Sequence, residues 1–211
     1  MKLPKEEIKL IDNYLKEKNI KHLDIRAELL DHLVTEFEEK SNYSLIKDYL
    51  LSKVDFIKNF SEKHQKTIHW SYQNKLWVKF AKFFYKPKFI LILFVLVALG
   101  YISLQLFGLK TFSYICYFTL LILIIYPLVY QIKYSKAVKN VQSMQSLFGI
   151  TALPSVFLYA FFPIKDVMLE NPLLLIIYYS FAILLGFSAV IIIENDRKKV
   201  LEKYHQLVNK E

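Results

Sequence analysis

One histidine has the spacing that metal sites on helices use. His32 lies four residues after Glu28 and four before Glu36, so a helix would place the three side chains on one face. A site would need a further ligand, for which His22 is only a candidate, and the string from His32 to Glu36 lacks the second histidine of HExxH. Cys116 is the one cysteine, which excludes a cysteine-based metal site and an intramolecular disulfide. We predict no metal and no cofactor, with His32 facing solvent.

The chain has no pattern typical of an enzyme. Its four longest apolar segments contain no Asp, Glu, Lys, Arg or His, whereas ion-coupled transporters, proton relays and voltage sensors need charges inside the membrane. The motifs GxxxxGK[ST], GxGxxG and GxSxG are also missing. We therefore predict no catalytic residues and a protein that is not an enzyme.

These uncharged segments have the length of membrane spans. They run over residues 89–109, 111–132, 140–164 and 171–193, and about 20 apolar residues suffice to cross the bilayer as a helix. The third begins with Asn140, Gln142, Ser143 and Gln145, which places the start of its apolar part near residue 146. The sequence predicts four transmembrane helices, at about 89–109, 111–132, 146–164 and 171–193.

The distribution of basic residues predicts the orientation of these spans. Twelve Lys and Arg residues flank them on one side, against Lys110 and Lys165 on the other. By the positive-inside rule the first side is cytoplasmic, which puts both termini in the cytoplasm of a bacterium, in its inner membrane. This topology also explains the net charge of +9, so we expect no nucleic acid partner. The start of the chain lacks the apolar core of a signal peptide, and residues 195–211 form a cytoplasmic tail.

Residues 1–66 predict a small cytoplasmic module of three amphipathic helices. Asp24 has the place of an N-cap for the second helix, which runs to about Lys40. The polar side of that helix is acidic and comprises Asp24, Glu28, Asp31, Glu38 and Glu39. This acidic face is either exposed to solvent, or it docks a basic partner or the protein's own lysine-rich helix. The apolar stripes predict the core, with Ile8, Ile11, Leu15, then Leu29, Leu33, Phe37, then Ile46, Leu50, Val54 and Ile57.

Residues 67–87 predict an amphipathic juxtamembrane helix. A stripe of Lys75, Lys79, Lys82 and Lys86 lies opposite aromatic side chains, and Pro87 follows directly. This pattern is typical of a helix in the lipid headgroup layer, where lysines attract an anionic leaflet. Alternatively, the aromatic residues pack on the cytoplasmic module. The candidate membrane-surface contacts are Trp70, Lys75, Trp77, Lys79, Phe80, Lys82, Phe84 and Lys86.

The predicted fold is therefore all-α: a cytoplasmic helical module (1–66), an amphipathic juxtamembrane helix (67–87) and a four-helix transmembrane bundle (88–194). Inside the bundle, Ala182 and Gly186 form a small-xxx-small pair that lets two helices approach closely.

The segments Ile11–Leu15 and Ile20–Leu33 resemble the start of small integral membrane proteins of Bacteroidota. They are also similar to the HAAS-type helical module that precedes transmembrane helices in bacterial membrane proteins, whose second helix matches Arg26, Glu28, Asp31 and His32. The resemblance covers about residues 5–60. It implies a role in regulation and signalling, without catalytic residues.

Three functions fit these patterns. The first is a non-enzymatic inner-membrane protein that acts in regulation or assembly through protein contacts of its cytoplasmic module, with a protein partner or a second copy. The second is an accessory subunit of a larger membrane transport or secretion complex. The third is a membrane protein that binds a lipid or small molecule through uncharged groups such as Gln105, Ser155 and Tyr159.

Overall fold

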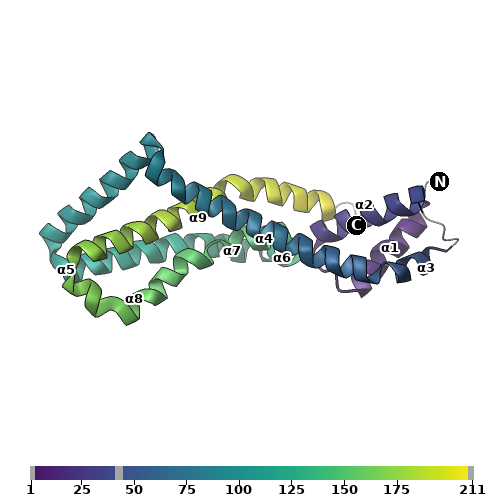
Figure 1. The fold of residues 1–211 in the computed structure, drawn as a ribbon, viewed down its shortest axis with the longest axis horizontal. Coiled ribbons are helices and arrows are strands. Elements are labelled where there is room, and N and C mark those ends of the chain that lie inside the picture. The colour runs from purple at the N-terminus through teal and green to yellow at the C-terminus, as the bar shows by residue number, and fades with distance from the viewer. Residues whose placement is uncertain (1–2, 41–44, 209–211) are drawn as a thin grey trace. The chain divides into compact units, whose positions relative to one another are not determined.

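The computed structural model describes residues 3–40 and 45–208, and within these ranges it contains helices and no strand, which confirms the all-α prediction (Figure 1). The helices are α1 Lys5–Glu17, α2 Leu23–Lys40, α3 Ile46–Ser52, α4 Val54–Tyr85, α5 Pro87–Lys133, α6 Ser135–Asn140, α7 Gln142–Gly149, α8 Ala152–Glu170 and α9 Pro172–Val208.

The described residues form two compact units that are discontinuous in sequence. The polar unit comprises 3–40, 45–70, 135–146 and 198–208, and the apolar unit comprises 71–134 and 147–197. The cytoplasmic module of the sequence prediction thus has two additional parts, one between α5 and α8 and one at the end of α9. Because the pattern of residues 1–66 is local, it contains no signal for these distant segments.

The core of the polar unit follows the predicted stripes. Ile11 and Leu15 of α1 pack with Leu29 and Leu33 of α2, and all four are fully buried. Tyr49 and the apolar residues of α3 complete this core, together with the start of α4. Such a core folds because apolar side chains leave water, which is the main favourable term in a small helical unit.

α4 differs from the prediction, because one helix of 32 residues replaces the end of the module and the separate juxtamembrane helix. Residues 54–85 contain no glycine or proline, so nothing in this stretch interrupts the backbone hydrogen bonds. Pro87 then starts α5 at its first turn, where a missing N–H costs nothing.

Three helical stretches are long and apolar enough to cross a membrane: Pro87–Lys133, Gln142–Glu170 and Pro172–Val208. The first has 47 residues and contains one residue with a non-helical backbone, Gly108, at φ 74° and ψ 168°. This left-handed conformation favours glycine, and the ribbon of α5 turns sharply there (Figure 1).

The apolar unit packs α5, α8 and α9 together. Phe112, Cys116 and Leu120 of α5 share a core with Leu175 and Tyr179 of α9, and Met168 of α8 joins them. A Cβ atom on Gly186 would lie 3.2 Å from Leu123 Cδ1 and 3.8 Å from Pro154 Cβ, so the absence of a side chain brings α9 close to both neighbours. Ala182 is fully buried one turn earlier.

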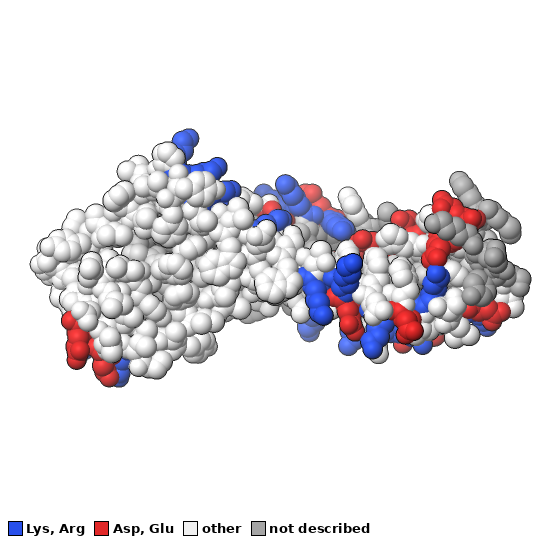
Figure 2. Space-filling model, in the orientation of Figure 1, with Lys and Arg blue, Asp and Glu red and all other residues white. Residues whose placement is uncertain are grey.

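The outer surface of the apolar unit consists of large apolar side chains. Leu91, Phe94, Leu99 and Leu106 of α5 are all more than half exposed. Figure 2 shows a broad surface without charged atoms over this part of the molecule, with charged atoms at its borders. Exposed apolar patches of soluble monomers span only a few hundred Å². Together with the three long apolar helices, this surface identifies a membrane protein.

Candidate functional site

Asp24 connects α2 to the start of α7. Its Oδ1 accepts hydrogen bonds from the N–H groups of Gln142 (3.0 Å) and Ile25 (3.1 Å). Its Oδ2 accepts from the N–H (2.9 Å) and the Oγ (2.7 Å) of Ser143. The first N–H groups of a helix have no partner within it, so Asp24 acts as the N-terminal cap of α7 from a position 118 residues away.

This contact corrects two predictions about Asp24. The residue lies in the first turn of α2 and caps α7, whereas we expected it to cap its own helix. It is only 4% exposed, so it does not belong to the acidic surface proposed for a partner. A carboxylate this deeply buried must be hydrogen-bonded, and the two N–H groups of α7 meet that need.

The other acidic residues of α2 have different surroundings. Glu28 pairs with His64 of α4, with 3.1 Å between Oε2 and Nε2. Glu38 accepts a hydrogen bond from the N–H of Leu3 at 2.7 Å. Asp31 and Glu39 are exposed. Glu28 is exposed despite this pairing, so the acidic surface available to a partner comprises Glu28, Asp31 and Glu39 and lacks the buried Asp24.

The histidines of the polar unit form no metal site. Within residues 3–40 and 45–208, no group of three or more His, Cys, Asp and Glu side chains is arranged to hold a metal ion. His32 is exposed, as expected, with its ring 5.3 Å from that of Phe60. His22 is half-buried, its Nδ1 has no hydrogen-bond partner, and burial lowers its pKa, partly offset by the charge of Asp24. Burial therefore favours the neutral form of His22.

Two grooves lie along α1. One, of about 650 Å³, lies between α1 and α3 and is lined by Leu10, Tyr14, Leu50 and Leu51, with charged residues around it. The other, of about 540 Å³, lies between α1 and α2, where Ile8, Leu23, Leu30, Val34 and Leu207 provide an apolar lining. Leu10 and Leu51 are exposed, at 37% and 64%, so the first groove continues into an open apolar surface.

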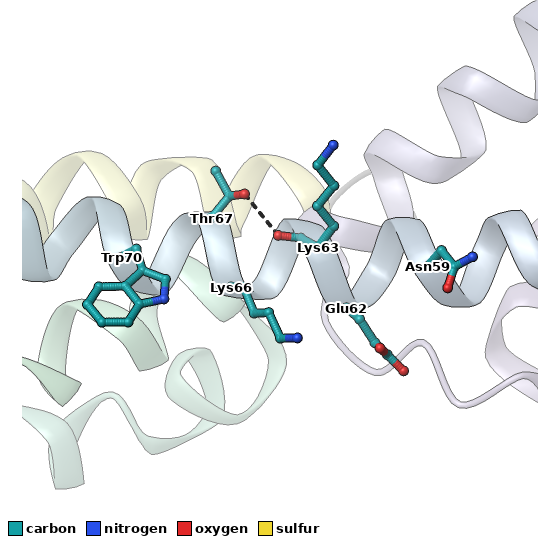
Figure 3. A pocket seen from close by; sticks show the side chains of 6 residues that line it. All are labelled: Asn59, Glu62, Lys63, Lys66, Thr67 and Trp70. Atoms are coloured by element: carbon teal, nitrogen blue, oxygen red, sulfur yellow. Dashed lines mark hydrogen bonds between the residues drawn. The ribbon is translucent and has the colours of Figure 1, made fainter.

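A third depression, of about 500 Å³, follows α4 alone. Asn59, Glu62, Lys63, Lys66, Thr67 and Trp70 line it at successive helical turns. Figure 3 shows Lys63 and Thr67 on one side of α4 and Glu62, Lys66 and Trp70 on the other, and the bond drawn is the one that Thr67 Oγ1 donates to the carbonyl of Lys63 at 2.9 Å. This arrangement does not converge on a ligand.

The second half of α4 presents two kinds of surface. Trp77 and Phe84 are exposed, as is Trp70 earlier in the helix, which suits the predicted membrane contacts. Phe80 corrects the prediction, because it is only 6% exposed and its ring lies 4.6 Å from that of Phe181 in α9. α4 uses this side, with Leu76 and Phe83, to pack within the apolar unit, and a helical wheel cannot distinguish such a face from a lipid-facing one.

The predicted lysines of α4 also divide into two groups. Lys75 Nζ pairs with Asp196 Oδ2 of α9 at 2.9 Å. Lys79 and Lys82 are half-buried and Lys86 is exposed. Among the residues that the structure describes, these three have no acidic partner.

Sequence reasoning missed a polar cluster that joins α5 to α9. Glu194 accepts hydrogen bonds from the Tyr126 hydroxyl (2.9 Å) and from Arg197 Nη2 (3.1 Å). The Arg197 guanidinium lies over the Tyr130 ring, 3.8 Å from its centroid. The Glu194–Arg197 spacing of three residues at the end of an apolar segment was the available signal, since such residues face each other on a helix.

The uncharged groups considered for ligand binding do not form an enclosed site. Gln105 and Tyr159 are both exposed. Ser155 Oγ donates to the carbonyl of Ala152 at 2.7 Å, a bond within its own helix turn. The geometry offers no reason to group these residues.

Comparison with known proteins yields no relative: no protein-family model, no curated protein and no solved structure matches this chain. The arguments on function therefore depend on the residues and contacts described above.

Proposed function

We propose that this chain is a non-enzymatic protein of the bacterial inner membrane with four spans and cytoplasmic termini, which acts in regulation or assembly through protein contacts of its cytoplasmic helices. The similarity of residues 5–60 to HAAS-type modules supports the regulatory role. The twelve basic residues on the side of the termini support the orientation.

The length and the break of α5 support four spans. A straight helix of 47 residues would extend about 70 Å, more than twice the roughly 30 Å of the hydrocarbon core. Gly108 divides it into runs of 87–107 and 109–133, each long enough to cross once. Lys110 follows the break and belongs at a membrane surface. The two other apolar helices complete the set.

The contact between Asp24 and α7 is the observation that carries the regulatory proposal. Gln142 and Ser143 begin the stretch that leads into the membrane-capable helix Gln142–Glu170. Because Asp24 holds their N–H groups, a protein that binds the cytoplasmic helices and shifts α2 would also move the start of this stretch. A structural connection of this kind is what a regulatory module requires.

The groove between α1 and α3 is the surface best suited to a protein partner. Exposed leucines beside charged rims attract an amphipathic segment, with apolar side chains in the groove and polar ones around it. Leu10 and Leu51 are at its open side, so they can be changed without disturbing the buried core.

Mass spectrometry of proteins that co-purify with the tagged full-length chain in mild detergent tests this function. We expect a stoichiometric partner, or a second copy, that is lost from Leu10→Gln/Leu51→Gln. Point variants are preferable to deletion of 1–66, because that deletion also removes Asp24 and part of α4. Turnover of a substrate by the purified protein alone, or a partner unaffected by the leucine variant, would contradict the proposal.

An accessory-subunit role is the second candidate, and the exposed pair Asp31 and Glu39 favours it, because these acidic residues suit a basic subunit. The double charge reversal Asp31→Lys/Glu39→Lys should then release the partner while Leu10→Gln/Leu51→Gln retains it. Each variant thus serves as the control for the other.

A further inference from the structure

Three lysines converge where α4 ends and α5 begins. Lys79 Nζ lies 5.1 Å from the centroid of the Phe89 ring, so it reaches from α4 to the first turn of α5. Phe83 and Phe89 hold this corner together, with 5.1 Å between their ring centroids. Lys82 and Lys86 follow at one and two helical turns from Lys79.

These lysines repel one another without compensation by acidic residues. Burial lowers the pKa of Lys79, and the neighbouring charges of Lys82 and Lys86 lower it further. Lys75, one turn earlier, has Asp196 as its partner, whereas none of the three has an acidic partner in the described part of the chain. On the face shown in Figure 2, Lys and Arg atoms lie at this corner without Asp or Glu atoms beside them. The positive charge of this corner is therefore not balanced by the described side chains.

The position of the corner determines which anion is available. α5 begins at Pro87 with an apolar stretch that is among those long enough to cross a membrane. The residues just before it must lie at the level of the lipid headgroups, where phosphate groups are concentrated. The exposed aromatic rings of Phe84 and Tyr85 suit the same layer.

We propose that Lys79, Lys82 and Lys86 form a binding site for the phosphate headgroup of an anionic lipid at the junction of α4 and α5. The positive-inside rule assigns lysines a role in orienting the spans. The proposed site has a second role, because it selects lipids by headgroup charge. The proposal rests on α5 entering the membrane at Pro87 and is independent of the protein contacts proposed above.

The test is native mass spectrometry of the full-length protein, delipidated and then offered phosphatidylglycerol or phosphatidylcholine. The wild type should retain phosphatidylglycerol preferentially. Each juxtamembrane lysine contributes about fivefold to binding an anionic surface, so Lys79→Gln/Lys82→Gln/Lys86→Gln should reduce the preference by about a hundredfold. The charge-conserving triple variant with Arg at all three positions should keep it.

A matched control removes the same charge elsewhere. Lys133, Lys136 and Lys139 are exposed and are predicted on the same side of the membrane, so their triple change to Gln should reduce the preference much less than the change at Lys79, Lys82 and Lys86. Equal losses in both Gln variants, or a preference retained after the change at Lys79, Lys82 and Lys86, would overturn the site. Displacement of phosphatidylglycerol by an excess of inorganic phosphate would identify a site for free phosphate and overturn the lipid assignment.

Discussion

The polar and the apolar unit arrange similar leucines for opposite solvents. Leu29 and Leu33 of the polar unit are completely buried, and two of its exposed leucines, Leu10 and Leu51, line one groove. In the apolar unit, leucines and phenylalanines are exposed along the whole of α5, whereas small or polar-tipped side chains such as Ala182, Ser188 and Tyr179 are buried. The free-energy cost of exposing an apolar side chain therefore depends on whether water or lipid surrounds the unit.

The polar contacts of the two units also differ in where they lie. In the polar unit, Asp24 is buried and holds α7 by hydrogen bonds, and Glu36 joins Tyr49 and Lys53 at 3.1 and 2.6 Å. In the apolar unit, the ion pairs with α9 involve Glu194, Asp196 and Arg197, which follow directly after the charge-free stretch of that helix ends at Ile193. Charges in the hydrocarbon layer are costly, so ionic contacts of a membrane bundle are confined to its ends.

The largest expected effect tests how much the burial of leucines away from water stabilises the polar unit. Leu29→Ala leaves a cavity in its core and should lower the free energy of unfolding of this unit by about 3 to 4 kcal/mol. Hydrogen–deuterium exchange of α1 to α3 in the full-length protein measures the change. Leu51→Ala, at an exposed position of α3, should alter it by at most about 0.5 kcal/mol. Equal effects of the two variants would mean that the core is not where the structure has it.

A second pair of substitutions compares a lysine introduced at a position expected to face lipid with one introduced at a position that faces water. Leu99 of α5 and Leu51 of α3 are 57% and 64% exposed. Leu99→Lys puts a charge near the middle of a predicted span and should disfavour insertion by about 3 kcal/mol, while Leu51→Lys should change stability by at most about 0.5 kcal/mol. The fraction of protein that remains in bacterial membranes after alkaline extraction reports this difference. Full insertion of Leu99→Lys would show that this part of α5 does not face lipid.

Much of the fold was predictable because its signals are local. The stripes of Ile11, Leu15, Leu29 and Leu33 gave the core of the polar unit, and the charge-free segments gave helices of membrane-spanning length. The continuity of α4 was also accessible, since no glycine or proline interrupts residues 54–85.

Contacts between distant segments could not be predicted. Asp24 has the sequence context of a cap for its own helix, and nothing nearby indicates that its carboxylate meets Gln142. Phe80 has the helical position of a lipid-facing residue, and only the packing of Phe181 against it reveals a protein contact. Periodicity identifies an apolar face, but what covers that face depends on the tertiary structure.

The third prediction tests the connection through Asp24. Asp24→Ala leaves the N–H groups of Gln142 and Ser143 without their acceptor and should weaken the start of α7 by about 2 kcal/mol. Hydrogen exchange in residues 142–146 should then accelerate by about thirtyfold. Asp31→Ala removes a carboxylate from the exposed side of α2 and should leave this segment unchanged. Unaltered exchange in Asp24→Ala would remove the structural basis of the regulatory proposal.

The smallest effect concerns pH and separates the units once more, because His22 belongs to the polar unit and the described apolar unit contains no histidine. Burial lowers the pKa of His22 in the folded state below the value of about 6.5 expected for the unfolded chain. The unfolded state then binds more protons, so the contribution of neutral His22 to stability is present above pH 6.5 and is lost as pH falls through and below that value. His22→Gln removes this titration while keeping a polar side chain of similar size.

Thermal unfolding should show a smaller loss of stability between pH 7.5 and 5.5 in His22→Gln than in the wild type. An equal loss would assign the acid sensitivity of the polar unit to other groups, and a loss confined to the apolar helices would contradict the distinction between the two units.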